Sequence, residues 1–118
     1  MPMNKRASGY NAEQLAAEYL KSEGFRIICR NHRCAGVEID IIAADGKELV
    51  FVEVKSSECA AAHPAEHVTP WQMKRYVRAA REYVAARGLF GVNVRFDVAE
   101  VVGGDVRLIR GAFDATTA

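Results

Sequence analysis

The chain has 118 residues, of which 50% are hydrophobic and 26% charged, with a formal net charge of +1. This length supports a core that needs no disulfide bonds, so we expect residues 1–118 to form a single domain with residues 1–8 and 112–118 flexible. No apolar run approaches the roughly 20 residues that span a bilayer, and no apolar signal segment opens the chain. The chain has three cysteines, an odd number that does not suggest a set of disulfide bonds. Together with the lack of apolar segments, this count argues against membrane and secreted classes and predicts a cytoplasmic protein without a membrane partner.

The first predicted helix runs from about residue 12 to residue 23. Asn11 and Gln14 fit a capping box at its start, and Gly24 suits the position after its end. Its apolar residues recur at the spacing of a core-facing helix: Ala12, Leu15, Ala16, Tyr19 and Leu20. Residues 25–29 are predicted to form the first strand.

A β-hairpin is predicted next. Residues 37–44 and 48–56 are rich in β-branched residues, and Asp45-Gly46 between them is a strong hairpin signal. A loop over residues 57–68 then leads to a second helix.

The second helix is predicted to begin after Thr69 and to end at Arg87. Thr69 and Gln72 form a capping-box pattern, with a proline in the first helical position. Residues 92–102 and 106–110 are the last predicted strands. The resulting order, α-β-β-β-α-β-β, predicts an α/β fold with a mixed β-sheet flanked by helices.

The hairpin gathers acidic side chains, because strand residues alternate between two faces. If Asp45-Gly46 is a two-residue turn, Glu38 lies opposite Glu53, and Asp40 lies opposite Phe51 on the same face. Asp40 is then a diagonal neighbour of Glu53, roughly 7–8 Å away at the backbone. Side chains of this length can converge on one cation.

These carboxylates repel one another and are expensive to bury without partners. Lys55 offsets part of the repulsion, and a divalent cation offsets more, since Mg²⁺ is typically held by one or two carboxylates together with waters and phosphate oxygens. The alternative is an ordinary solvent-facing side of an antiparallel sheet. Leu49, Phe51 and Ile42 share the face, so it is at least partly covered, which favours the metal site.

The stretch VEIDIIAADGKELVFVEVK, residues 37–55, resembles the YraN-like proteins, a bacterial family. It is similar to Holliday-junction resolvases and to the PD-(D/E)XK nucleases, which share a restriction endonuclease-like core. The resemblance covers most of the chain, including Gly9, Glu13, Tyr19, Leu20, Gly24, Asn31, Arg33, Lys74 and residues 95–98. Two departures are Val37, in place of a glycine, and Ser57, in place of a basic residue that would contact phosphate.

The resemblance implies a metal-dependent endonuclease that hydrolyses DNA phosphodiesters with Mg²⁺ or Mn²⁺ as its cofactor. The implied substrate is structured or double-stranded DNA. The implied catalytic residues are Asp40, Glu53, Lys55 and Glu13, and the implied metal ligands are Asp40, Glu53, the Val54 carbonyl and Glu38. Lys55 would orient the attacking water or stabilise developing negative charge. Junction resolvases also imply a homodimer by analogy. The alternatives are a non-catalytic nucleic-acid-binding module on the same fold and an interaction protein without a nucleic-acid role.

The charges are unevenly distributed along the chain. Residues 34–66 hold seven acidic residues and two lysines, whereas residues 67–95 hold six basic residues and one acid. On the second helix, Lys74, Arg78 and Arg81 are spaced to share one face. This row is predicted to bind nucleic-acid phosphates, and its alternative is a solvated helix face.

Three further patterns carry weaker expectations. Cys59, His63 and His67 recur every four residues, but this spacing matches no standard zinc site. Trp71, at the start of the second helix, is predicted to be buried or partly buried, and its alternative is stacking on a base. Asp97 is predicted to face solvent or a helix end, because its neighbours alternate inward.

Overall fold

The computed structural model describes residues 5–58, 65 and 68–115, with side chains from residue 12 onward. The predicted order of elements is confirmed as α1 (Lys5–Ser22), β1 (Arg26–Cys34), β2 (Val37–Asp45), β3 (Glu48–Ser57), α2 (Pro70–Ala86), β4 (Asn93–Val102) and β5 (Asp105–Phe113). Residues 5–8, expected to be flexible, lie in α1, and residues 112 and 113 lie in β5. Cys59, His63 and His67 lie outside the described residues.

The five strands form one mixed sheet in the order β1-β2-β3-β4-β5. Only β3 and β4 are parallel, and α2 is the crossover between them, while the other neighbours are antiparallel. The α/β fold with a mixed sheet is therefore confirmed. In the described part of the chain, no helix has the length and apolar character needed to cross a membrane.

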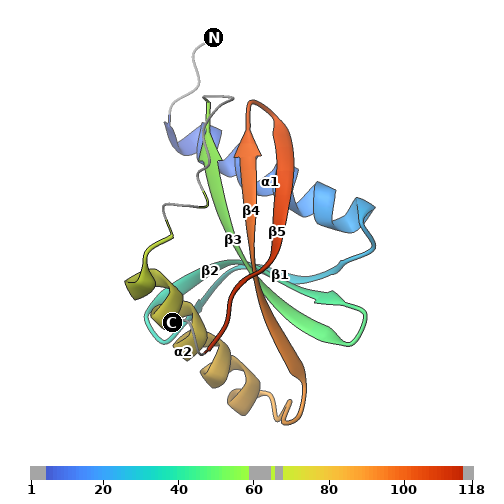
Figure 1. Ribbon diagram of the computed structural model, residues 1–118, viewed down its shortest axis with the longest axis vertical. Helices are drawn as coiled ribbons and strands as arrows, with labels where there is room; N and C mark the ends of the chain where they lie inside the picture. The colour runs from blue at the N-terminus through green and yellow to red at the C-terminus, as the bar shows by residue number, and fades with distance from the viewer. Residues whose placement is uncertain (1–4, 59–64, 66–67, 116–118) are drawn as a thin grey trace.

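The two helices pack on opposite faces of the sheet, and Figure 1 shows α2 beside β1 and β2 while α1 crosses β3, β4 and β5. On the α1 side, small residues of the helix pack against the sheet: Ala12, Ala16 and Ala17 against Ile41, Val50, Val52 and Ala99. On the α2 side, aromatic rings dominate: Phe51, Tyr76, Tyr83, Phe96 and Phe113. The sheet is thus covered on both faces.

The start of α2 and the end of α1 follow the sequence signals, whereas the start of α1 does not. The predicted capping box of α2 is confirmed, since the Thr69 hydroxyl accepts from the Gln72 N–H at 3.2 Å and the Gln72 side chain accepts from the Thr69 N–H at 2.9 Å. Gly24 ends α1 with a φ of +91°, which suits glycine. The predicted Asn11 cap is wrong, because α1 begins at Lys5 and Asn11 lies inside it.

The register of the β2–β3 hairpin differs from the prediction. Asp45 pairs with Glu48, so the turn residues are Gly46 and Lys47. Gly46 has a φ of +61° and takes the first turn position, as in a type II′ turn, which leaves Asp45 in its strand. Ile42 therefore lies opposite Phe51, and the predicted pairs Asp40–Phe51 and Glu38–Glu53 are wrong.

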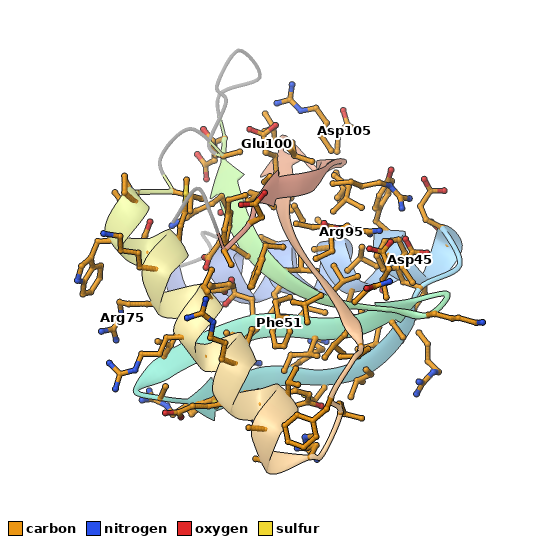
Figure 2. All side chains as sticks on the ribbon, turned by 60° about the horizontal axis from the view of Figure 1, so that its bottom comes forward. Asp45, Phe51, Arg75, Arg95, Glu100 and Asp105 are labelled. Carbon is orange, nitrogen blue, oxygen red and sulfur yellow. The ribbon has the colours of Figure 1, made fainter. Side chains whose placement is uncertain are left out.

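Arg95 stabilises this register from the neighbouring strand β4. Its Nη1 donates at 2.9 Å both to Asp45 and to Glu48, the two residues that close the hairpin. Arg95 and Asp45 lie together at the edge of the molecule in Figure 2. The guanidinium also binds both carboxylate oxygens of Asp97 at 2.9 Å, and Asp97 is fully buried. The prediction that Asp97 faces solvent or a helix end is wrong, because this bidentate pair compensates its burial.

Candidate metal centre

The strands β2 and β3 separate where the acidic residues lie. Their ladder ends at the pair Ile41–Val52. Beyond this pair β2 remains bonded to β1 as far as Val37, and β3 remains bonded to β4 as far as Ser57. Asp40 and Glu53 are therefore the first residues on the two arms of a fork in the sheet.

The β1–β2 hairpin departs from regular strand geometry beside Asp40. The pairing passes from Arg30–Ile41 to His32–Ile39, and Asn31 between them has a φ of +53°, a conformation that asparagine tolerates. Strand alternation breaks here, since Ile39 packs on the α2 side together with Ile42. Ile39 and Ile41, which regular alternation would place on one face, therefore lie on opposite faces of the sheet.

The Asp40 side chain completes the hydrogen bonding of the separated strands. Its Oδ2 accepts from the Val54 N–H at 2.8 Å. This N–H points to the side of β3 where β2 would have supplied a backbone carbonyl. In an antiparallel ladder the N–H and C=O of one residue point to the same side, so the Val54 carbonyl also faces the fork.

Asp40 and Glu53 form a coupled carboxylate pair. Burial first of all, and then the charge of Glu53, raise the pKa of Asp40 to about 8, although the Val54 N–H lowers it. A hydrogen bond with Glu53 and the charge of Glu13 raise this pKa further. Asp40 therefore holds a proton at neutral pH, and a cation bound beside Glu53 would have to displace it.

Lys55 is the basic residue at the fork. Its Nζ lies 3.8 Å from Glu53 Oε1, and the two side chains are 25% and 17% exposed. The predicted alternation that places Glu53 and Lys55 on one face therefore agrees with this contact. In the described part of the chain, Asp40 itself has no ion-pair partner.

Glu13 reaches the site from α1. It pairs with Arg30 of β1 at 3.2 Å, and Arg30 also donates to the Gln14 side chain at 2.8 Å. The Glu13 side chain is only 14% exposed, and its charge acts on Asp40. Arg30 therefore holds the helix-borne carboxylate beside the sheet.

Glu38 lies further out on β2. It is about half exposed and pairs with Arg33 at 3.8 Å. It also lines an open groove of about 230 Å³ that includes Glu53, Tyr76 and Arg75. Glu38 thus faces the same groove as Glu53, although it is not the opposite residue that the predicted register required.

Tyr76 of α2 closes the site on its inner side. Its ring packs in the core against Phe113, and its hydroxyl accepts from the Asp40 N–H at 3.4 Å. The pKa of Tyr76 is raised, first by burial and then by the charges of Asp40 and Glu53, and the hydroxyl is hydrogen-bonded to Glu53. The phenol therefore stays protonated and donates to the Glu53 carboxylate.

The donor set at the fork matches a hard divalent cation. Within residues 12–58, 65 and 68–115, no three histidine, cysteine or acidic side chains form a ready metal-binding group. Asp40, Glu53 and the Val54 carbonyl supply oxygen ligands from two side chains and one backbone group. Mg²⁺ and Mn²⁺ suit such a set, since Mg²⁺ keeps several waters and takes only one or two carboxylates.

The predicted basic row lies on another flank of α2. Lys74, Arg78 and Arg81 are exposed and line a groove of about 300 Å³ near Ala115. Arg75 is the basic residue of α2 that lines the groove of Glu53, and Figure 2 shows it on the side of the molecule away from Arg95. The row thus shares one surface, as predicted, but does not line the fork.

Sequence reasoning missed the functional setting of Arg30, Tyr76 and Trp71. Tyr76 follows the same helical spacing as the core residues around it, so nothing in its position marks a polar contact. Arg30 lies in a strand, and no acidic residue stands next to it in the sequence. Trp71 was predicted to be at least partly buried, but it is 65% exposed, because its position in the first turn of α2 points it away from the sheet.

Comparison with known proteins gives a consistent result. Residues 12–101 match the family described as "Uncharacterised protein family UPF0102". A UPF0102 protein of Geobacter sulfurreducens is 47% identical over 91 residues, which cover 76% of this chain and 71% of that protein. One from Desulfosudis oleivorans is 43% identical over 120 residues, covering 98% of both chains, and one from Chlorobaculum parvum is 47% identical over 105 residues, covering 86% and 81%.

Proposed function

The chain belongs to the UPF0102 family, and we propose that it is a metal-dependent endonuclease that hydrolyses DNA phosphodiesters on a restriction endonuclease-like core. The resemblance to the YraN-like family, drawn from residues 37–55, is confirmed by this membership. The family description assigns no activity, so the support comes from the fork. The coupled pair of Asp40 and Glu53, with Lys55 beside it, carries the proposal.

The fold supports this proposal through the placement of the pair. The carboxylates lie where an antiparallel hairpin separates, with one helix on each face of the sheet. The resemblance to PD-(D/E)XK nucleases implies the same three residues, Asp40, Glu53 and Lys55. Two independent lines, motif and geometry, thus select one corner of the molecule.

A cation would be held by Asp40 and Glu53, together with the Val54 carbonyl and waters. Bound there, Mg²⁺ or Mn²⁺ would polarise a phosphate and lower the pKa of a water molecule. Glu13 and Glu38 would act from further out, since each is already paired with an arginine.

The protein's own groups serve the chemistry in distinct ways. Lys55 Nζ, 3.8 Å from Glu53, is placed to donate a hydrogen bond to a phosphate oxygen or to the attacking water. Tyr76 is a positioning residue, because its hydroxyl holds Glu53 while its ring is fixed in the core. The half-buried setting strengthens each of these electrostatic contacts.

We also propose a partner, a cellular compartment, a second binding surface and an oligomeric state. DNA is the partner, the cytoplasm is the compartment, and Lys74, Arg78 and Arg81 are a second, phosphate-binding surface on another flank of α2. A homodimer is proposed by analogy with junction resolvases, since a four-way junction has two scissile strands. Light scattering of the protein with and without a junction tests this stoichiometry.

Calorimetric titration of Mn²⁺ into wild type and Asp40→Asn tests the metal site. We expect binding to wild type and a loss of binding in Asp40→Asn. Asp105→Asn is the matched control, because Asp105 is exposed at the β4–β5 turn, and it should bind as wild type does. Absence of Mn²⁺ binding to wild type, with or without DNA, would overturn the nuclease and leave a non-catalytic binding module as the better account.

A further inference from the structure

Trp71 is the only tryptophan of the chain, and it is 65% exposed. The Arg75 guanidinium lies 4.5 Å from the centre of its ring. Arg75 is itself fixed, because its Nη2 donates to the Gly36 carbonyl at 2.8 Å. The tryptophan therefore has one face held by a cation and a large remaining surface open to solvent.

Trp71 lines the same groove as Glu53. The groove of about 230 Å³ joins residues from three segments: Gly36, Val37, Glu38, Glu53, Trp71, Gln72, Arg75 and Tyr76. A ligand atom at Glu53 and an aromatic group at Trp71 can thus belong to one bound molecule. An isolated exposed tryptophan is common on protein surfaces. Trp71 differs because an arginine fixes its ring beside a carboxylate site, and this arrangement indicates a ligand.

The lining of this groove carries both signs of charge. Glu38 and Glu53 would repel a phosphate, whereas Arg75 adds a positive charge at the groove wall. Arg75 cannot move freely to a distant partner, since Gly36 and Trp71 hold it. The strand of a nucleic acid, with its phosphates on one side and its bases on the other, matches this pairing of cation and aromatic ring.

We propose that Trp71 stacks on an unpaired nucleobase adjacent to the phosphate that a cation held by Asp40 and Glu53 would bind. The substrate class is then DNA with a single-stranded segment or an extruded base next to the scissile bond. Bases inside a continuous duplex are already stacked and do not reach such a ring. Stacking on an aromatic side chain tolerates any base, so the preference is for strand structure and not for sequence. This inference rests on the proposed nuclease function and specifies its substrate.

The fluorescence of Trp71 tests the inference directly, because no other tryptophan contributes to the signal. Wild-type protein in Ca²⁺ buffer is titrated with oligothymidylate and, separately, with a blunt duplex of the same length. We expect saturable quenching by the single strand and roughly tenfold weaker binding of the duplex. Unchanged fluorescence with the single strand, or equal quenching by the duplex, would overturn the inference.

Variants separate stacking from general attraction. In fluorescence anisotropy with labelled oligothymidylate, Trp71→Ala should bind roughly tenfold more weakly, and Trp71→Phe should recover most of the affinity. Phe90→Ala is the control, since Phe90 is 78% exposed but follows the other end of α2, and it should bind as wild type does. Equal binding by wild type and Trp71→Ala would contradict the stacking role.

The two proposals fail in different ways. Cleavage of DNA by wild type without any change in Trp71 fluorescence overturns the stacking inference and leaves the nuclease. Saturable quenching without metal-dependent cleavage overturns the nuclease and leaves a single-strand binding surface.

Discussion

The Asp40 carboxylate accepts a hydrogen bond from the Val54 N–H at 2.8 Å, just beyond the last pair of β2 and β3, Ile41–Val52. A side chain thus replaces the backbone acceptor that the diverging strand cannot supply. The bond also holds Asp40 beside Glu53, where their repulsion and burial raise the pKa of Asp40. The same carboxylate thus stabilises the separated strands and forms part of the candidate metal centre.

Asp40→Asn should stabilise the metal-free protein at slightly alkaline pH. Asparagine keeps an oxygen for the Val54 N–H and removes the charge. The folded-state pKa of about 8 lies above the ordinary 3.8, so the folded wild type binds more protons than the unfolded chain between these values. The free energy of unfolding of the wild type therefore falls as the pH rises through this window. The difference in this free energy between Asp40→Asn and wild type grows by a few kcal/mol at most. Urea unfolding in EDTA from about pH 4 to about pH 8 measures it. A constant difference between the two proteins would contradict the raised pKa.

Metal affinity should fall as the pH is lowered below about 8, because a cation must displace the proton of Asp40. Calorimetry of Mn²⁺ binding in two buffers of different ionisation enthalpy gives the number of protons released. Close to one proton is expected at neutral pH. Binding that releases none would mean that the metal binds elsewhere.

Tyr76→Phe should weaken the site much more than the fold. The ring stays packed against Phe113, while Glu53 loses its donor and the Asp40 N–H loses its acceptor. We expect a loss of about 1 kcal/mol in stability and roughly tenfold in Mn²⁺ affinity. Tyr83→Phe is the matched control, since Tyr83 is buried on the same helix and its ring packs on Phe51. Equal effects of the two changes on metal affinity would remove Tyr76 from the site.

Arg95→Met should destabilise the protein without affecting the metal site. Asp97 is fully buried and, among the residues that the structure describes, would keep the Gly111 N–H as its donor, at 3.0 Å. Breaking a buried ion pair costs about 3–5 kcal/mol, so a clear decrease in Tm is expected. Arg78→Met, at an exposed position on α2, should leave Tm nearly unchanged. A small effect of Arg95→Met would show that the hairpin register does not depend on this network.

The order of elements was predictable because each helix and strand carries its own periodicity and end signals. The start of α1 was not, since residues 5–11 have no apolar stripe to extend the helix towards Lys5. The hairpin register was not predictable either. Asp45-Gly46 allows two turns, and the choice is supported by Arg95, which is distant in sequence.

The candidate site was predictable as a set of residues but not as an arrangement. The motif selects Asp40, Glu53 and Lys55, and alternation relates Glu53 to Lys55. The fork, the Asp40–Val54 hydrogen bond and the contact with Tyr76 depend on the separation of two strands and on a helix packed from elsewhere in the chain. Such long-range geometry leaves no local signal in the sequence.

The most direct test of the proposed nuclease compares cleavage of an end-labelled four-way DNA junction by wild type, Lys55→Ala and Lys47→Ala in Mn²⁺. Lys47 is exposed at the β2–β3 turn and serves as the matched lysine control. Cleavage by wild type and Lys47→Ala, with its loss in Lys55→Ala while calorimetry shows retained Mn²⁺ binding, is the predicted result. Undiminished cleavage by Lys55→Ala, or no cleavage by metal-bound wild type, would contradict the proposed nuclease site.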